Sequence, residues 1–424
     1  MGEILKNYHT DKDKLNKLKL KDYPYLKVGN ILATQIWKVH TCNPKEIIKK
    51  LLSIILCDKY VYEYKPYNQS SMIMLNASAG MLRGDNELIM RNALSFMEPC
   101  TEINITKCNK LALNKVCKKI KSAWGYFNEI EIIDSTLSRW FYAVSLVLLN
   151  ELSKDFDEKI VGVSLLVTFM DSDLFENYLT QTVQHFGGKV AALQHGQRFY
   201  IPEPCDSYVG MDNLTADYKL VWSKFSRQQF MNAGYGVERL PIIGSTKYLD
   251  TPKKSMQSNK IAVFLDGPFT YGSKESNKKM LDFTTYLAGK NMFSLLVKPH
   301  PVDDIENYEI GDKEVIELVS PKIQINELSE DIMFGIVHTS GVAIDLLILD
   351  VPVLIYDSGE YFPIDLPSKY FFKNMDELAA ILLEWKNNPE AMIEEFEQIR
   401  SNYIEQNPRK LHSDFFSSFK GEPS

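Results

Sequence analysis

The feature that most constrains the fold is a regular alternation of short apolar segments and amphipathic helical stretches along most of the chain. The segment Ile160–Phe169 is apolar on both faces, as expected for a strand inside a parallel sheet that helices cover on both sides. Strand, helix and strand repeat at the spacing that is typical of a doubly wound sheet. The expected fold class is therefore α/β.

Two such series are expected. The first has strands at Ile160–Phe169, Val190–Leu193, Tyr218–Val221 and Leu240–Ile243 and helices at Asp173–Phe186 and Lys224–Ala233. The second has strands at Ile261–Leu265, Phe293–Lys298, Ile323–Asn326, Ile336–His338 and Val353–Tyr356, and helices near Asn277–Ala288, Val342–Leu349 and Met375–Trp385. Outside the two series we expect helices at Asn43–Leu56, Ser135–Leu152 and Pro389–Asn407, short strands at Ser70–Leu75 and Ile130–Ile133, and a loosely packed arm or surface helix over the first ~25 residues.

The polar segment Asp250–Asn259 interrupts the alternation and is the expected linker. It predicts an N-terminal Rossmann-like domain over residues 1–250 and a second Rossmann-like domain over residues 258–388. A C-terminal helix and tail are expected over residues 389–424.

Composition excludes several classes of protein. The net charge of −7 argues against a nucleic-acid binder, which needs a broad basic field. The six cysteines form no CxxC pair and no metal spacing, so they are expected to be buried thiols. No apolar run approaches the ~18 residues of a membrane span, and the N-terminus has no secretory signal. The expected location is the cytoplasm.

Three polar clusters each follow a predicted strand of the second series, where open α/β sheets bind ligands. They are Leu265-Asp266-Gly267-Pro268-Phe269-Thr270-Tyr271-Gly272-Ser273, Lys298-Pro299-His300-Pro301 and His338-Thr339-Ser340-Gly341. The last cluster offers hydroxyl and N–H groups to an anion at a helix start. Ser340 taken alone is better explained as a helix N-cap, and the neighbouring clusters are what favour a bound phosphodiester. Pro299 and Pro301 stiffen the turn that carries His300. His300 is expected to be a proton donor to a departing phosphate, and the alternative is an exposed histidine in a structural turn.

In the first series, Gln194-His195-Gly196 ends a buried strand and Arg198 follows it. His195 is expected to be a general base, with a satisfied core histidine as the alternative. Asp171-Ser172-Asp173 resembles a metal-binding DxD motif, but an aspartate at this position is also well placed to cap the next helix.

The stretch Lys107–Trp124 predicts a basic helix with Lys110, Lys115, Lys118, Lys119 and Lys121. It is expected either to lie on an anionic membrane surface or to be an ordinary solvated helix face.

The order of these motifs resembles bacterial surface-polysaccharide transferases of the GT-B fold, over roughly residues 160–390. It runs from Gln194-His195-Gly196 through Lys298-Pro299-His300-Pro301 to Thr339-Ser340-Gly341, a helix and Val351-Pro352-Val353-Leu354. Two branches are similar: teichoic-acid CDP-glycerol glycerophosphotransferases, and the capsule transferases that use CMP-linked sialic acid or Kdo. The helix followed by Pro352 is also similar to the UDP-GlcNAc 2-epimerases.

The resemblance implies two Rossmann-like domains that face a central cleft. It also implies an inverting, metal-independent glycosyltransferase with no cofactor, which moves a sugar from a CMP or CDP donor to a glycan or glycolipid acceptor. The donor is expected to be a CMP-linked acidic sugar, and peripheral contact with the inner face of the cytoplasmic membrane is expected. The alternatives are a CDP-glycerol-type transferase, a 2-epimerase or a non-catalytic nucleotide-sugar-binding subunit.

The resemblance also implies roles for the motif residues. The residues expected to bind the nucleotide donor are Asp266, Gly267, Thr270, Lys298, Pro299, His300, His338, Thr339, Ser340 and Gly341. Those expected to bind the acceptor are Gln194, Gly196 and Arg198, and the catalytic candidates are His195, His300, Asp171 and Asp173. Leu265-Asp266-Gly267 only partly matches the acidic pair of the CMP branch, which leaves the base open between His195 and one of Asp171 and Asp173.

Overall fold

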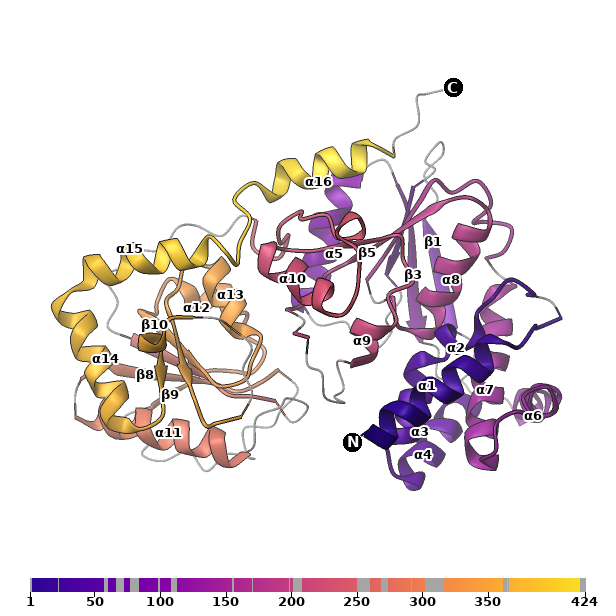
Figure 1. Cartoon of the computed structure of the whole chain (residues 1–424), viewed down its shortest axis with the longest axis horizontal. Helices are drawn as coiled ribbons and strands as arrows, with labels where there is room; N and C mark the ends of the chain where they lie inside the picture. Colours follow the sequence, from indigo (N-terminus) through magenta and orange to yellow (C-terminus); the bar gives the residue numbers. More distant parts are fainter. Residues whose placement is uncertain are drawn as a thin grey trace.

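Figure 1 shows the computed structural model. It describes residues 2–21, 23–56, 60–65, 72–76, 84–97, 100–107, 113–154, 156–169, 171–197, 199–200, 208–249, 260–267, 274–290, 292–301, 316–360, 364 and 366–419. Two six-stranded sheets form successively along the chain, each with helices packed beside it. The structure thus confirms the α/β class with two parallel-sheet units.

The first sheet has the strand order β1-β3-β2-β4-β5-β6, and β1 alone runs antiparallel to its neighbour. Its strands are β1 (Tyr60–Lys65), β2 (Met72–Asn76), β3 (Thr101–Lys107), β4 (Leu165–Thr168), β5 (Lys189–Leu193) and β6 (Tyr218–Leu220). The helices of this half are α1 (Gly2–Asn16), α2 (Val28–Ile31), α3 (Ala33–Thr41), α4 (Pro44–Ile55), α5 (Gly84–Met97), α6 (Leu113–Glu129), α7 (Thr136–Ser153), α8 (Leu174–His185), α9 (Tyr208–Asp212) and α10 (Lys224–Asn232). The chain moves from β2 to β3 on one side and returns to β4 on the other, so the topological switch point lies between β2 and β4.

The second sheet is parallel throughout, in the order β12-β11-β10-β7-β8-β9. Its strands are β7 (Lys260–Phe264), β8 (Ser294–Lys298), β9 (Ile316–Leu318), β10 (Phe334–Val337), β11 (Val353–Tyr356) and β12 (Phe371–Phe372). Its helices are α11 (Lys274–Gly289), α12 (Ile325–Ser329), α13 (Val342–Ile348), α14 (Met375–Asn387) and α15 (Pro389–Arg400). The chain leaves β7 toward β8 and β9 and then returns to β10, which places the switch point between β7 and β10.

The end of the chain connects the two halves. After α15, the chain crosses back and α16 (Pro408–Ser417) packs against α5 of the first half (Figure 1). Buried His412 and Phe416 lie on α16, and the Phe415 ring packs edge-on against Tyr218 with centroids 5.6 Å apart. The expected linker, residues 250–259, lies outside the described residues, so the domain boundaries remain predictions.

Several predicted elements are wrong, each for a local reason. Ile130–Ile133 is not a strand, because Ile130 ends α6 with a backbone hydrogen bond to Tyr126 and the segment then turns. Leu240–Ile243 contributes one isolated bridge rather than a strand, since Pro241 has no N–H to donate. Ile323–Asn326 lies at the start of α12, which a capping box of Gln324 and Glu327 initiates.

The terminal predictions also need correction. The first residues form α1, which is docked rather than loose: Tyr8 and Leu15 are buried, and Lys12 forms an ion pair with Asp212 at 2.6 Å. The single helix expected over Pro389–Asn407 ends at Arg400, and a second helix follows. The basic helix begins at Leu113 instead of Lys107, which ends β3. Among the described helices, none is long and apolar enough to cross a bilayer.

Candidate functional site

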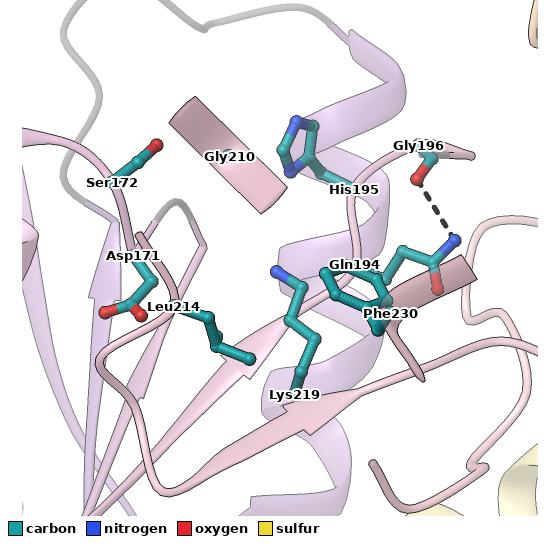
Figure 2. Close-up of a pocket in the computed structure, with 9 residues that line it drawn as sticks. All are labelled: Asp171, Ser172, Gln194, His195, Gly196, Gly210, Leu214, Lys219 and Phe230. Atoms are coloured by element: carbon teal, nitrogen blue, oxygen red, sulfur yellow. Dashed lines mark hydrogen bonds between the residues drawn. The ribbon is translucent and has the colours of Figure 1, made fainter. Parts of the chain in front are cut away.

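A small pocket of about 20 Å³ lies where β4, β5 and β6 of the first sheet end (Figure 2). It is lined by Asp171, Ser172, Gln194, His195, Gly196, Gly210, Leu214, Lys219 and Phe230. Asp171 and His195 follow neighbouring strands, β4 and β5, and β4 borders the switch point. Four of these residues, Asp171, Gln194, His195 and Gly196, are candidates predicted from the sequence, and the structure brings them to one pocket.

Gln194 fixes the turn that presents His195. Its buried amide accepts a hydrogen bond from the Trp222 N–H at 2.9 Å and donates to the Gly196 carbonyl at 3.1 Å. It therefore ties the end of β5 to the end of β6, and its role is to shape the turn. The half-buried imidazole of His195 lies against the Phe169 ring, with centroids 5.0 Å apart. His195 is therefore a partly exposed side chain at the edge of the pocket.

Lys219 is a pocket residue that the sequence analysis missed. Its side chain is buried, and its ammonium donates to the Leu193 carbonyl at 2.9 Å. Figure 2 shows the ammonium pointing into the space between Asp171 and His195. A lysine in the middle of the apolar strand Tyr218–Val221 was the available sequence signal, since lysine is rarely buried without a partner or a task.

Asp171 is held by its own hydrogen bonds. Its two carboxylate oxygens accept from the Thr215 N–H and hydroxyl, from the Ala216 N–H at 2.8 Å and from the Thr180 hydroxyl at 3.3 Å. Burial raises the pKa of this carboxyl, while the same hydrogen bonds and Lys219 act in the opposite direction. Four donors fill the lone-pair sites of one carboxylate, so Asp171 fastens the 215–216 loop. Asp173 caps α8, because its side chain accepts from the Leu174 N–H at 3.0 Å.

A second cluster lies at the switch point of the second sheet, where β7 and β10 end. Asp266 follows β7, and its fully buried carboxylate accepts from His338 Nδ1 at 2.8 Å. The same oxygen accepts from the Thr339 N–H at 3.1 Å and from the Thr339 hydroxyl at 2.8 Å. The other ring nitrogen of His338 lies 2.7 Å from the Ser358 hydroxyl and 3.1 Å from the Glu360 carboxylate. Asp266 therefore positions His338 and Thr339.

His300 lies beside this cluster. It follows β8, the neighbour of β7, and its ring lies so close to Gly267 that an added Cβ would be 2.5 Å from the ring Cγ. Only glycine permits this approach. Lys298 is buried and donates to the Pro321 carbonyl at 3.1 Å, so it anchors the turn that Pro299 and Pro301 stiffen. Three strand ends therefore meet at Asp266-Gly267, with His300 on one side and Thr339 on the other.

The remaining predicted residues fall around this point or outside the description. Thr339 and Ser340 are buried, and the Ser340 hydroxyl accepts from the Val342 N–H at 3.3 Å while Gly341 occupies the cap of α13. Thr270 and Arg198 lie outside the described residues.

Glu360 was also missed by the sequence analysis, although it follows a predicted strand as the other clusters do. It borders a hollow of about 220 Å³ with Ile355, Asp357, Gly359 and Phe371. The rule that located the other clusters, polar residues just after a strand, applies equally to Asp357-Ser358-Gly359-Glu360 after β11.

A buried ion pair joins the two halves next to the second cluster. Lys247 Nζ lies 2.7 Å from Asp345 Oδ2, and both side chains are nearly inaccessible to solvent. Asp345 lies on α13, the helix that Thr339 and Ser340 precede, whereas Lys247 closes the first half of the chain. The pair thus ties the end of the first half to the switch point of the second sheet.

The comparisons identify the fold. No family model matches the sequence, and a search of curated proteins found no related sequence. Among solved structures, a Listeria monocytogenes protein assigned as a UDP-N-acetylglucosamine 2-epimerase is similar at 13% identity with a TM-score of 0.54, over 83% of this chain and 97% of that one. A Neisseria meningitidis UDP-GlcNAc 2-epimerase has a TM-score of 0.48 at 13% identity, over 82% of this chain and 98% of that one. The wall teichoic acid polymerase TagF has a TM-score of 0.47 at 14% identity, over 92% of this chain and 98% of that one. At 13% identity, the likeness to the Listeria monocytogenes protein shows the GT-B fold and nothing about activity.

Proposed function

We propose that this protein is an inverting glycosyltransferase of GT-B fold that moves a sugar from a nucleotide donor to a glycan or glycolipid acceptor. The observation that carries the proposal is the meeting of three strand ends at the switch point between β7 and β10. His300 and the Thr339-Ser340 hydroxyls lie there on either side of Asp266-Gly267. Open α/β sheets bind nucleotides at such switch points.

The donor is proposed to be a CMP-linked acidic sugar. The support is the order of the His-Pro and Thr-Ser-Gly motifs, which is similar to the CMP-sugar branch. Imidazole and hydroxyl groups are suitable donors to a phosphate oxygen. CDP-glycerol uses the same cytidine base and is the alternative donor.

The mechanism is a direct displacement. An acceptor hydroxyl attacks the anomeric carbon, the bond from that carbon to the CMP phosphate oxygen breaks, and the hydroxyl proton passes to His195. His300 donates a hydrogen bond to the departing phosphate and stabilises its charge. The bonding of Asp171 supports His195 as the base, because the Asp171 oxygens are already occupied by four donors.

No metal ion takes part in this proposal. The Asp171 carboxylate accepts hydrogen bonds from the 215–216 loop, and Asp173 Oδ1 accepts one from the Leu174 N–H at the start of α8, so each aspartate has a structural role of its own. The enzyme is proposed to work in the cytoplasm at the inner face of the membrane.

A 2-epimerase is the second candidate, and the observation that favours it is the fold shared with the Listeria monocytogenes protein. Product analysis distinguishes the two. A transferase releases CMP in proportion to acceptor and at most slowly without it, whereas an epimerase converts a UDP-sugar with no acceptor present. Acceptor-independent turnover of a UDP-sugar would overturn the transferase proposal.

A further inference from the structure

Two neighbouring helices of the first half, α4 and α6, expose large apolar side chains. Ile48 and Leu52 on α4 and Leu56 directly after it follow at intervals of four residues and are 46, 46 and 44% exposed. On α6, Ile120 and Trp124 are 44 and 55% exposed. Both helices pack against α7 and touch each other, and Figure 1 shows them at the outer edge of the first half. Residues four apart lie on one helix face, so each helix presents an apolar stripe to solvent.

The same two helices also expose lysines. Lys45 and Lys49 are exposed on α4, and Lys118 and Lys121 are exposed on α6. None of the four forms an ion pair within the described part of the chain, whereas buried Lys119 pairs with Glu151 at 3.1 Å. The exposed acidic residues of the two helices are Glu46 and Glu129. A chain of net charge −7 thus carries four exposed lysines on the two helices that present its apolar stripes.

Trp124 is held in place despite its exposure. Its ring lies 5.5 Å from Phe127 and 5.8 Å from Trp140, and the Arg139 guanidinium lies 4.1 Å above the Phe127 ring. An indole supported in this way loses little conformational freedom when its outer edge enters an interface. Tryptophan is the residue that favours the boundary between lipid and water.

We propose that these nine residues form a membrane-docking surface for an anionic lipid bilayer. The surface consists of Ile48, Leu52, Leu56, Ile120 and Trp124 with Lys45, Lys49, Lys118 and Lys121. Apolar side chains enter the interface and the lysines meet lipid phosphates, as in helices that lie in the membrane plane. The surface is independent of the nucleotide that the protein binds. A second copy of the chain fits poorly, because a two-fold interface would bring like-charged lysines face to face.

Sedimentation with vesicles tests the proposal. The full-length protein should bind phosphatidylcholine vesicles containing 30% phosphatidylglycerol at least tenfold more tightly than pure phosphatidylcholine vesicles, and added salt should weaken the binding. Each lysine near the lipid surface should contribute about fivefold to vesicle affinity. The quadruple variant K45Q/K49Q/K118Q/K121Q should therefore bind anionic vesicles about 100-fold more weakly, or weaker still. The variant L52S/W124S, which removes two apolar side chains, should bind the anionic vesicles at least tenfold more weakly than the wild type.

The matched control changes four exposed lysines elsewhere, K224Q/K290Q/K386Q/K410Q, and should bind anionic vesicles as the wild type does. All variants should keep the wild-type melting temperature and nucleotide affinity. The vesicle experiment does not depend on nucleotide binding, so it still tests the docking surface if the nucleotide proposal fails. Equal binding to neutral and anionic vesicles would overturn the proposal, as would equal losses in the control. A wild-type dimer that L52S/W124S converts to monomer without any vesicle binding would assign the surface to a second copy instead.

Discussion

Replacing Gly267 with alanine tests whether His300 has to stay where the structure places it. The added Cβ would lie 2.5 Å from His300 Cγ and 2.7 Å from Nδ1, whereas ordinary van der Waals contact begins near 3.4 Å. The partly exposed ring must therefore retreat by roughly 1 Å to restore ordinary contact with the added Cβ.

The expected magnitude follows from the hydrogen bond that His300 is proposed to donate. A hydrogen bond to a charged group contributes about 1.5–3 kcal/mol, so His300→Ala should weaken CMP binding by roughly 10- to 150-fold. A displacement of about 1 Å removes most of such an interaction, and Gly267→Ala should weaken binding by at least tenfold. Because both changes remove one interaction, the double variant should bind within about twofold of His300→Ala alone.

Calorimetric titration of CMP into the wild type, the two single variants and the double variant measures these affinities. Gly289→Ala is the matched control, since a Cβ at Gly289 meets no atom within 4 Å. Wild-type affinity in Gly267→Ala, or losses that simply add in the double variant, would refute the link between Gly267 and His300.

Four further predictions concern other parts of the structure. His195→Ala should lower turnover roughly 10²–10⁴-fold with CMP affinity nearly unchanged, and a variant that keeps its turnover would exclude His195 as the base. Turnover should survive excess EDTA; full loss restored by Mg²⁺ or Mn²⁺ would return Asp171 and Asp173 to consideration as ligands. Lys247→Ala should reduce the free energy of unfolding by about 3–5 kcal/mol in urea titrations, because it removes the cation that lies 2.7 Å from the nearly inaccessible Asp345 carboxylate, and a K247M/D345L variant should recover much of that loss. Burial lowers the pKa of His412 from 6.5 to about 4, so this residue should cost up to about 1.4 kcal/mol of stability per pH unit as the pH falls from 6.5 toward 4; His412→Gln should show a shallower decline, and parallel curves would refute the assignment.

The sequence predicts most of the second sheet because its strands are short apolar runs between recognisable helices. The same logic fails where an apolar run lies in a turn or at a helix start, as at Ile130–Ile133 and Ile323–Asn326. The antiparallel β1 and its partner β3 carry alternating polar residues and lie before the regular series, so the pattern did not predict them.

For the candidate site, the sequence predicts where residues lie along the chain but not which residues they contact. Strand ends can be recognised in the sequence, and the sequence therefore predicts that His195, His300 and Thr339 lie just after strands. What each side chain does there depends on partners far along the chain, such as Thr215 for Asp171 and His338 for Asp266. The pair of Lys247 and Asp345 joins residues 98 apart and has no local signal at all.

A calorimetric panel of CMP, CDP, UDP and GDP on the wild-type protein tests the central claim most directly. We expect cytidine nucleotides to bind more tightly than the others, and a nucleotide at about 100-fold above its dissociation constant should add about 2.7 kcal/mol to stability, visible as a raised melting temperature. Binding of UDP alone, without binding of either cytidine nucleotide, would contradict the cytidine donor and favour the epimerase.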